Sequence, residues 1–472
     1  MVILPELVLA AGALALFFVS LSKTPPVRIA KSVAVLFGLA TFAAALLAFQ
    51  SKGSLFYGAY AVDSYSQLFK ALIGFSLAVL LIFGQNLKGI SPEIRPEYYL
   101  FLLLSVLGLM MLVSSVELIA IFISLELSSF ALYLLVPMRD DRTGSRVQME
   151  AGMKYILFGV MATGFMLYGM SLLYGLTGTT YLKEIIAFLA KGNVQPTVLV
   201  AVLLVLAGFF YKLAVFPLHF WVPDVYQGAS NETAGFIATL PKFGAVALLI
   251  RFLTVPTGQA QFLIELMAAL ALCSMFYGNL SALVQKDIKR MLGFSGIAHA
   301  GFVLLGLLAL DRDGYGVAIY YIAGYVLMNL ACFLVISNVS REGENLRIDD
   351  FNGLYKRQPL LAFVLAVGLF GLAGIPPFVG FMGKFMILTS ALRAHHVVVV
   401  CLAAINTAIA LYYYLSVVKA AYTVEPGEQA GRIAVNPLIQ LTGVVLVLAI
   451  TLLGALPARF IDFASAVVQT LH

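Results

Sequence analysis

Long apolar stretches recur from one end of the chain to the other, with short polar segments between them. An α-helix needs about 20 mainly apolar residues to cross a bilayer. Because a helix satisfies its own backbone hydrogen bonds and the stretches are too long for barrel strands, the pattern predicts an all-α integral membrane protein with about 14 transmembrane helices. The predicted spans are 3–21, 29–49, 64–84, 98–114, 115–137, 153–176, 197–217, 233–254, 260–283, 291–310, 315–339, 359–390, 397–421 and 437–458.

Composition supports this class. Of the 472 residues, 62% are hydrophobic and 11% are charged, whereas soluble domains carry about 25% charged residues. The three cysteines stand singly, so neither a disulfide framework nor a metal site is expected. The first apolar run lacks a basic flank and is followed by further runs, which indicates a membrane helix and not a signal peptide. The chain contains no basic–aromatic patch for nucleic acid and no nucleotide-binding loop, so no cofactor is expected in it.

Basic residues in the connecting segments predict the orientation, because cytoplasmic loops are enriched in Lys and Arg. If the N-terminus is outside, the inside segments hold seventeen basic residues and the outside segments seven. The inside set is Lys23, Arg28, Lys31, Lys88, Arg95, Arg139, Arg142, Arg146, Lys286, Lys289, Arg290, Arg341, Arg347, Lys356, Arg357, Lys419 and Arg432, and the outside set is Lys52, Lys183, Lys191, Arg251, Arg312, Arg393 and Arg459. With fourteen spans, both termini are therefore predicted on the outer side.

Five basic residues remain inside the predicted spans, namely Lys70, Lys154, Lys212, Lys242 and Lys384, and the carboxylate of Glu126 lies mid-span in ISLELSS. A charge at the bilayer centre costs about 2.5–3.5 kcal/mol, so such residues point to a function. The alternative is that a long side chain reaches the interface along its own helix. For Lys70 and Lys154 that alternative stays open, whereas function is the favoured interpretation for the other four.

The chemistry expected of these mid-span residues is the binding and release of protons. Burial lowers the pKa of a lysine because desolvation disfavours its charged form, and a nearby carboxylate raises it again. A Lys–Glu pair can therefore bind and release a proton, and we expect Glu126 and Lys212 to form one. His299, with Ser295 one turn before it, is either a relay group or a satisfied buried imidazole, and the same choice holds for His219.

Two predicted spans are interrupted. The seventh meets Pro217, and the twelfth contains the sequence LAGIPPFVGFMGK. Broken helices in corresponding positions of two halves indicate a transporter with internal repeats and an ion path at mid-membrane. Each interrupted span carries one lysine, Lys212 or Lys384.

Several segments resemble the antiporter-like membrane subunits of respiratory complex I. They are FYKLAVFPLHFWVPDVYQGAS, NLSALVQKDIKRMLGFSGIAHAGF and GIPPFVGFMGKF. WVPDVYQG and the N-terminal LPELVLAAGALALF are similar to the N branch of that family and less so to L, M or the Mrp antiporter subunits. One departure follows VYQGA, where the family usually has a Pro-Thr-Pro run and this chain reads SNETAGF.

The resemblance implies two inverted repeats, helices 4–8 and 9–13, within one membrane domain. Its parts would be residues 1–97 (helices 1–3), 98–254 (first repeat), 260–421 (second repeat) and 437–472 (helix 14). It further implies a proton relay of Glu126, Lys212, Lys242, His299 and Lys384. The implied function is proton pumping coupled to electron transfer from NADH to quinone.

The same resemblance implies the surroundings of the chain. Flavin and iron–sulfur clusters would lie in other subunits, and the partners would be the M-, K-, J- and A-like membrane subunits and the lipid of a bacterial inner membrane. A subunit of a Mrp-type sodium/proton antiporter is the alternative, because it shares the buried Lys and Glu chemistry. A membrane scaffold without transport is a second alternative. The four mid-span charges and the two broken helices argue against it.

Overall fold

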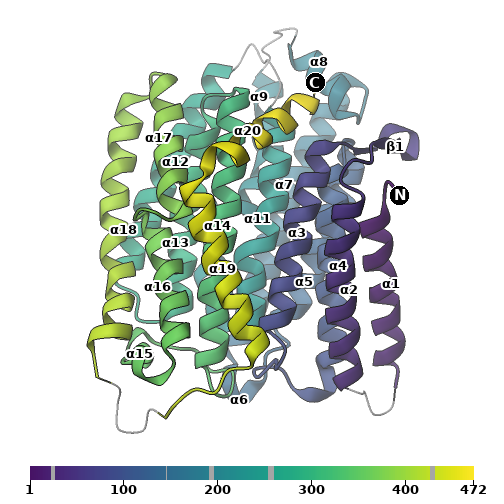
Figure 1. Cartoon of the computed structure of the whole chain (residues 1–472). Helices are drawn as coiled ribbons and strands as arrows, with labels where there is room; N and C mark the ends of the chain where they lie inside the picture. Colours follow the sequence, from purple (N-terminus) through teal and green to yellow (C-terminus); the bar gives the residue numbers. More distant parts are fainter. Residues whose placement is uncertain (23–26, 145, 191–195, 254–259, 426–430, 472) are drawn as a thin grey trace.

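The computed structural model describes residues 1–22, 27–144, 146–190, 196–253, 260–425 and 431–471. Lys23 and Lys191, two members of the charge count, lie outside these ranges. The described chain is a bundle of helices that run side by side (Figure 1). It also contains one antiparallel hairpin, in which β1 (Gly53–Leu55) pairs with β2 (Tyr60–Val62). The predicted helical membrane fold is confirmed, with this hairpin as the departure.

Within the described ranges, twelve helical segments are long and apolar enough to cross a membrane. Their helices are α2 (Val27–Leu47), α3 (Ser64–Phe83), α4 (Arg95–Ser114), α5 (Leu118–Leu135), α7 (Val147–Thr177), α9 (Pro196–Leu213), α11 (Asn231–Leu253), α12 (Ala260–Leu283), α13 (Ile288–Leu307), α14 (Arg312–Val339), α18 (Val397–Thr423) and α19 (Pro437–Ala455). The other two predicted spans coincide with shorter apolar helices, α1 (Leu4–Ser20) and α16 (Pro359–Ala373), the latter continued by α17 (Val379–Arg393). The count of fourteen spans therefore stays a prediction.

Short elements cover the two ends of the bundle. They are η1 (Phe56–Gly58), η2 (Pro92–Ile94), α6 (Asp141–Gly144), α8 (Leu182–Ala190), α10 (Val222–Gly228), η3 (Ile348–Phe351), α15 (Leu354–Arg357), α20 (Pro457–Val468) and η4 (Gln469–Leu471). Both termini, β1, α8 and α20 lie at one end, and α6 and α15 lie at the other (Figure 1). We name these the outer end and the inner end after the charge-based orientation, which itself remains a prediction.

Both interrupted spans break as predicted, and they end in the same way. At the end of α9, Ala214 has a φ of 69°, and the Val215 N–H donates to the Phe210 carbonyl at 2.9 Å. At the end of α16, Gly374 has a φ of 87°, and the Ile375 N–H donates to the Phe370 carbonyl at 2.9 Å. This left-handed cap is a Schellman motif, which ends a helix and satisfies its last carbonyls.

The first break therefore begins before the predicted Pro217, since the cap at Ala214 already stops the helix. A cis peptide bond to proline follows each cap, at Pro217 and at Pro377. Both caps and both prolines recur at a spacing of 160 residues (374 minus 214 and 377 minus 217). Such a recurrence is what internal repeats produce, although the proposed repeat boundaries stay predictions.

Helices α11 and α14 occupy the middle of the bundle (Figure 1). Their most apolar 18-residue windows are 100% buried, whereas that of α18 is 28% buried. Any polar side chain within these buried stretches is consequently surrounded by protein and not by lipid. These two helices position the groups described next.

Candidate functional site

Lys212 lies in the last turn of α9, directly before the first break. Its side chain is buried, and Nζ donates to Ser129 Oγ on α5 at 3.0 Å. A cation in the last turn also lies at the negative end of the helix dipole. The break thus holds an ammonium group inside the bundle.

Glu126 lies one turn before Ser129 on α5, and it accepts a hydrogen bond from Thr163 Oγ1 on α7 at 2.8 Å. Among the described residues, Glu126 and Lys212 are not within ion-pair distance of each other, although their charges interact. The expected direct pair is therefore replaced by an arrangement in which the Ser129 hydroxyl takes the lysine. Sequence reasoning missed Ser129, whose available signal was its place in the ISLELSS segment with Glu126.

Lys384 lies on α17, just beyond the second break, and reaches back across it. Its buried Nζ donates to the carbonyls of Leu372 at 2.8 Å and Ala373 at 3.2 Å. These are carbonyls of the last turn of α16, which lack helical partners and carry partial negative charge. A Cβ atom added to Gly374 would stand 3.1 Å from Lys384 Cδ, so glycine here also leaves room for the lysine stem.

A chain of hydroxyl and imidazole groups crosses the space between Lys242 and the second break. Lys242 Nζ on α11 donates to Tyr325 Oη on α14 at 3.0 Å and to the Gly296 carbonyl at 3.1 Å. The His299 ring packs on the Tyr325 ring, with centroids 5.0 Å apart. Its Nδ1 lies 2.6 Å from Tyr321 Oη, one turn from Tyr325 on α14.

His299 is held from its other side as well, since Nε2 lies 3.1 Å from Tyr414 Oη on α18. Both ring nitrogens are therefore hydrogen-bonded, and the roles of donor and acceptor depend on the tautomer. Sequence reasoning missed the three tyrosines. The four-residue spacing of Tyr321 and Tyr325, which places them on one helix face, was the available signal.

His219 does not join this chain. It is buried beside the first break, and neither ring nitrogen has a hydrogen-bond partner among the residues that the structure describes. Its ring packs among Phe216, Phe220 and Tyr277, with centroid distances of 5.3, 4.5 and 4.3 Å. The surroundings of His219 are aromatic and not those of a relay group.

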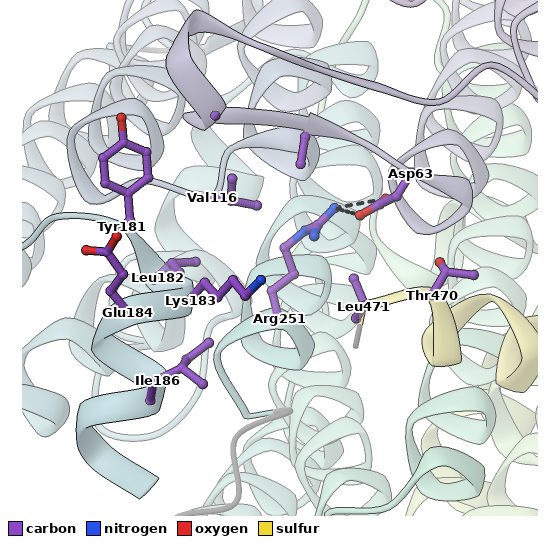
Figure 2. A pocket seen from close by; sticks show the side chains of 13 residues that line it. Asp63, Val116, Tyr181, Leu182, Lys183, Glu184, Ile186, Arg251, Thr470 and Leu471 are labelled. Atoms are coloured by element: carbon purple, nitrogen blue, oxygen red, sulfur yellow. Dashed lines mark hydrogen bonds and ion pairs between the residues drawn. The ribbon is translucent and has the colours of Figure 1, made fainter. Parts of the chain in front are cut away.

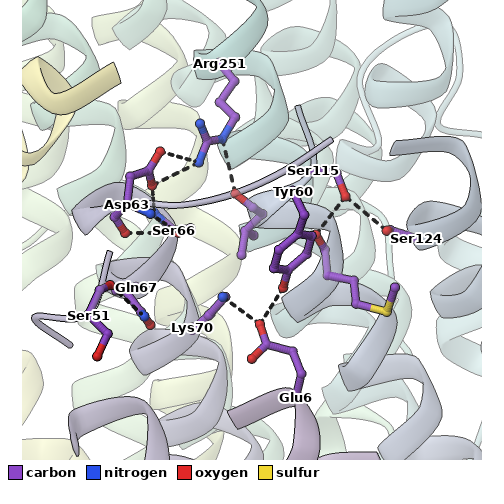
Figure 3. Close-up of polar contacts among 12 residues, drawn as sticks. Glu6, Ser51, Tyr60, Asp63, Ser66, Gln67, Lys70, Ser115, Ser124 and Arg251 are labelled. Carbon is purple, nitrogen blue, oxygen red and sulfur yellow. Dashed lines mark hydrogen bonds and ion pairs between the residues drawn. The ribbon is translucent and has the colours of Figure 1, made fainter. Parts of the chain in front are cut away.

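Lys70 is paired inside the protein, so it does not reach for the interface. Its Nζ lies 2.6 Å from Glu6 Oε1 on α1, and Tyr60 Oη donates to the same oxygen at 2.6 Å (Figure 3). Arg251 on α11 pairs nearby with Asp63 at 2.9 Å. This second buried polar cluster ties the first three helices to the rest of the bundle, and sequence reasoning missed Glu6 as the partner of Lys70.

Lys154 behaves as a surface residue. Its side chain is 37% exposed and forms ion pairs with Glu150 and with Asp224 of α10, each at 2.6 Å. Arg290 Nη1 also donates to Asp224, at 2.7 Å. Partial burial alone would raise the pKa of Asp224, but the hydrogen bonds from Lys154 and Arg290 lower it overall.

A hollow of about 710 Å³ opens at the outer end of the bundle (Figure 2). Its wall includes Asp63, Tyr181, Lys183, Glu184 and Arg251, and none of the predicted relay residues lines it. No group of three His, Cys, Asp or Glu side chains suited to a metal occurs among the described residues. The chemistry therefore concentrates in the buried polar line from Lys242 to Lys384.

Fold and site together define a polytopic helical membrane protein with ionisable groups at two helix breaks, the architecture of a transporter-like membrane subunit. A family described as "NADH:quinone oxidoreductase/Mrp antiporter, TM" matches residues 115–410. The chain belongs to this family.

Its similar relatives include two proteins named NADH-quinone oxidoreductase subunit N 2. The one from Opitutus terrae is 53% identical over 97% of this chain and 96% of its own length. The one from Solidesulfovibrio magneticus is 44% identical over 100% and 99%.

Solved structures agree with the fold. A chain of respiratory complex I from Thermus thermophilus matches with a TM-score of 0.83 and 32% identity, over 97% of this chain and 98% of that one. A chain of the Mrp complex from a Dietzia species matches with a TM-score of 0.86 over 99% and 97%. At 21% identity, this second likeness concerns the fold alone.

Proposed function

We propose that this chain is a proton-translocating membrane subunit of a bacterial NADH–quinone oxidoreductase, in the role of subunit N. The observation that carries the proposal is the buried line of polar groups from Lys242 through Tyr325, His299 and Tyr321 toward Lys384. Ionisable groups in the interior of a membrane bundle are expensive and mark proton relays. The family relationship indicates the reaction to which proton transfer is coupled, the transfer of electrons from NADH to quinone.

His299 is the central transfer group of the proposed relay. A neutral imidazole donates from one nitrogen and accepts at the other, so a proton taken up on one side can be released on the opposite side. The hydroxyls of Tyr321 and Tyr414 lie on its two sides, at 2.6 and 3.1 Å. Tyrosine hydroxyls both donate and accept. Tyr325 can therefore exchange a proton with Lys242, and Tyr321 and Tyr414 can exchange one with the imidazole.

Lysines at the two breaks are the proposed terminal groups. Lys384 rests on helix-end carbonyls and Lys212 on a serine hydroxyl, and neither contact neutralises the ammonium as a carboxylate would. In the described contacts the two ammonium groups touch a carbonyl or a hydroxyl and no carboxylate. A lysine that loses its proton therefore leaves no unpaired negative charge beside it. Glu126 lies one turn from Ser129 and adds a carboxylate to the polar surroundings of Lys212.

This chain would carry no redox chemistry, and the flavin and iron–sulfur clusters would reside in other subunits. Its partners would be the M-, K-, J- and A-like membrane subunits, within the bacterial inner membrane. The charge asymmetry supports a periplasmic position for both termini.

An affinity tag on this chain tests the proposal against the Mrp alternative. The purified assembly should contain flavin and iron–sulfur subunits, oxidise NADH with quinone and acidify sealed inverted vesicles. An assembly without redox subunits that exchanges sodium for protons would establish the antiporter instead.

A further inference from the structure

Glu232 is a buried carboxylate that the relay described above does not use. It stands in the SNETAGF segment, where this chain departs from the family pattern, and in the first turn of α11. Its residue is 4% exposed, although it lies near the inner end of the bundle. The first turn of a helix favours a carboxylate, but a helix end alone does not explain why one is buried here.

The charges of three cations from different segments interact with the Glu232 carboxylate. They are Lys88 before α4, Arg139 after α5, and Lys289 on α13. Backbone carbonyls hold all three. Lys289 Nζ donates to Ala229 at 2.7 Å, Lys88 Nζ donates to Ser340 at 2.6 Å, and the Arg139 guanidinium donates to Gln227, Thr143 and Gly343 at 2.8–3.0 Å.

Among the described residues, no cation stands within 4.0 Å of the Glu232 carboxylate. The cations therefore interact with its charge through space and form no direct ion pair with it. Other ionisable groups near these segments are Tyr98, Tyr99, Asp287 and Glu344.

Buried polar atoms without a partner continue from Glu232 toward Lys242. Helices α11 and α14 pack together, with Gly235 against Phe333 and Lys242 against Tyr325. This antiparallel register places Glu232 near the level of Ser337, and Thr239 near the level of Asn329.

Within the described part of the chain, the buried side-chain oxygens of Ser337 and Asn329 have no hydrogen-bond partner. The same holds for the hydroxyl of Tyr226, which borders Gly296 beside Lys242. Buried polar atoms of this kind are satisfied by water in proteins. The ten residues from Glu232 to Lys242 span about 15 Å of helix, a distance that a few waters and hydroxyls can bridge.

We propose that Glu232 is a proton-uptake residue, which takes protons from the inner side and passes them along the α11–α14 seam to Lys242. The inference rests on the proposed proton-pumping function. Glu232 would hold the proton, Ser337, Asn329 and Tyr226 would order the water between, and Lys242 would receive it.

Glu232→Gln in the whole complex, assayed in sealed inverted vesicles, tests this role. NADH oxidation and proton pumping should both fall at least five-fold in the coupled state while assembly is retained, and Glu232→Asp should keep most of the activity. The matched control is Glu344→Gln, which removes a carboxylate whose charge acts on the same cations but which lies off the seam; it should pump at the normal ratio and rate.

The double variant Glu232→Gln/Lys289→Gln removes one charge of each sign. It therefore distinguishes proton uptake by Glu232 from a purely electrostatic role. It should remain defective, and recovery of pumping would show that Glu232 only balances Lys289. Asn329→Leu interrupts the seam without changing any charge and should also slow pumping.

Full activity of Glu232→Gln or Asn329→Leu would overturn the proposal. If Lys242→Met and Lys384→Met in the same assay also pump normally, the proposed function itself fails; if they are defective, only the uptake role of Glu232 fails.

Discussion

Replacing Lys384 separates titration from simple positive charge at the second helix break. Lys384→Met keeps the length and apolar stem but removes the group that donates to Leu372 and Ala373. Hydrogen bonds from a charged group contribute about 1.5–3 kcal/mol each. Removing a buried ammonium also relieves its desolvation cost, which is of similar size. The net change in stability is therefore small, and the variant complex should assemble.

The functional change should be much larger. A group that transfers protons typically contributes a factor of about 10²–10⁴ to rate, so proton pumping should fall at least ten-fold, or about 1.4 kcal/mol in barrier. Lys384→Arg should be defective too, because a guanidinium with a pKa above about 12 does not release its proton.

The assay is proton uptake per NADH oxidised in sealed inverted vesicles, normalised to the amount of assembled complex. Phe385→Leu, at the exposed neighbouring position of α17, is the matched control and should behave as the unmodified protein. Full pumping by Lys384→Arg would mean that Lys384 acts as a fixed charge, and the relay role of this residue would be wrong.

Four other expectations follow from the described contacts. Glu126→Gln should assemble normally and pump at least five-fold more slowly, as measured in the same vesicles; wild-type pumping would remove Glu126 from the relay. Lys70→Met should strip the buried carboxylate on α1 of its partner and cost about 3–5 kcal/mol, seen as loss of assembled complex on native gels, and a stable variant would contradict this. Because the pKa of Asp224 is lowered in the folded protein, its contribution to stability is present above its unfolded pKa and is lost as pH falls through the lower folded value; Asp224→Asn should flatten the acid limb of a thermal-unfolding profile, and an unchanged limb would refute the assignment. Cysteine introduced at Lys183 should react with an impermeant reagent from the periplasm and cysteine at Arg142 from the cytoplasm, whereas the reverse pattern would invert the proposed orientation.

The apolar periodicity by itself determined the helical membrane fold, because a bilayer admits few other backbone arrangements. Proline and glycine within an apolar run also indicated that both helices break, although the cap that ends α9 lies at Ala214, before Pro217. The buried lysines could also be identified from the sequence, because a charged residue is rare within a long apolar run.

Only the tertiary structure decided what each charge contacts. Lys70 finds Glu6 on another helix, Lys154 lies at the surface with Asp224, and Lys212 meets Ser129 in place of Glu126. Such contacts depend on helix rotation and on pairing between segments far apart in the chain, which hydrophobicity does not encode. The tyrosines around His299 and the cations around Glu232 are likewise ordinary residues in the sequence, and they become a polar path only where α11, α13, α14 and α18 pack together.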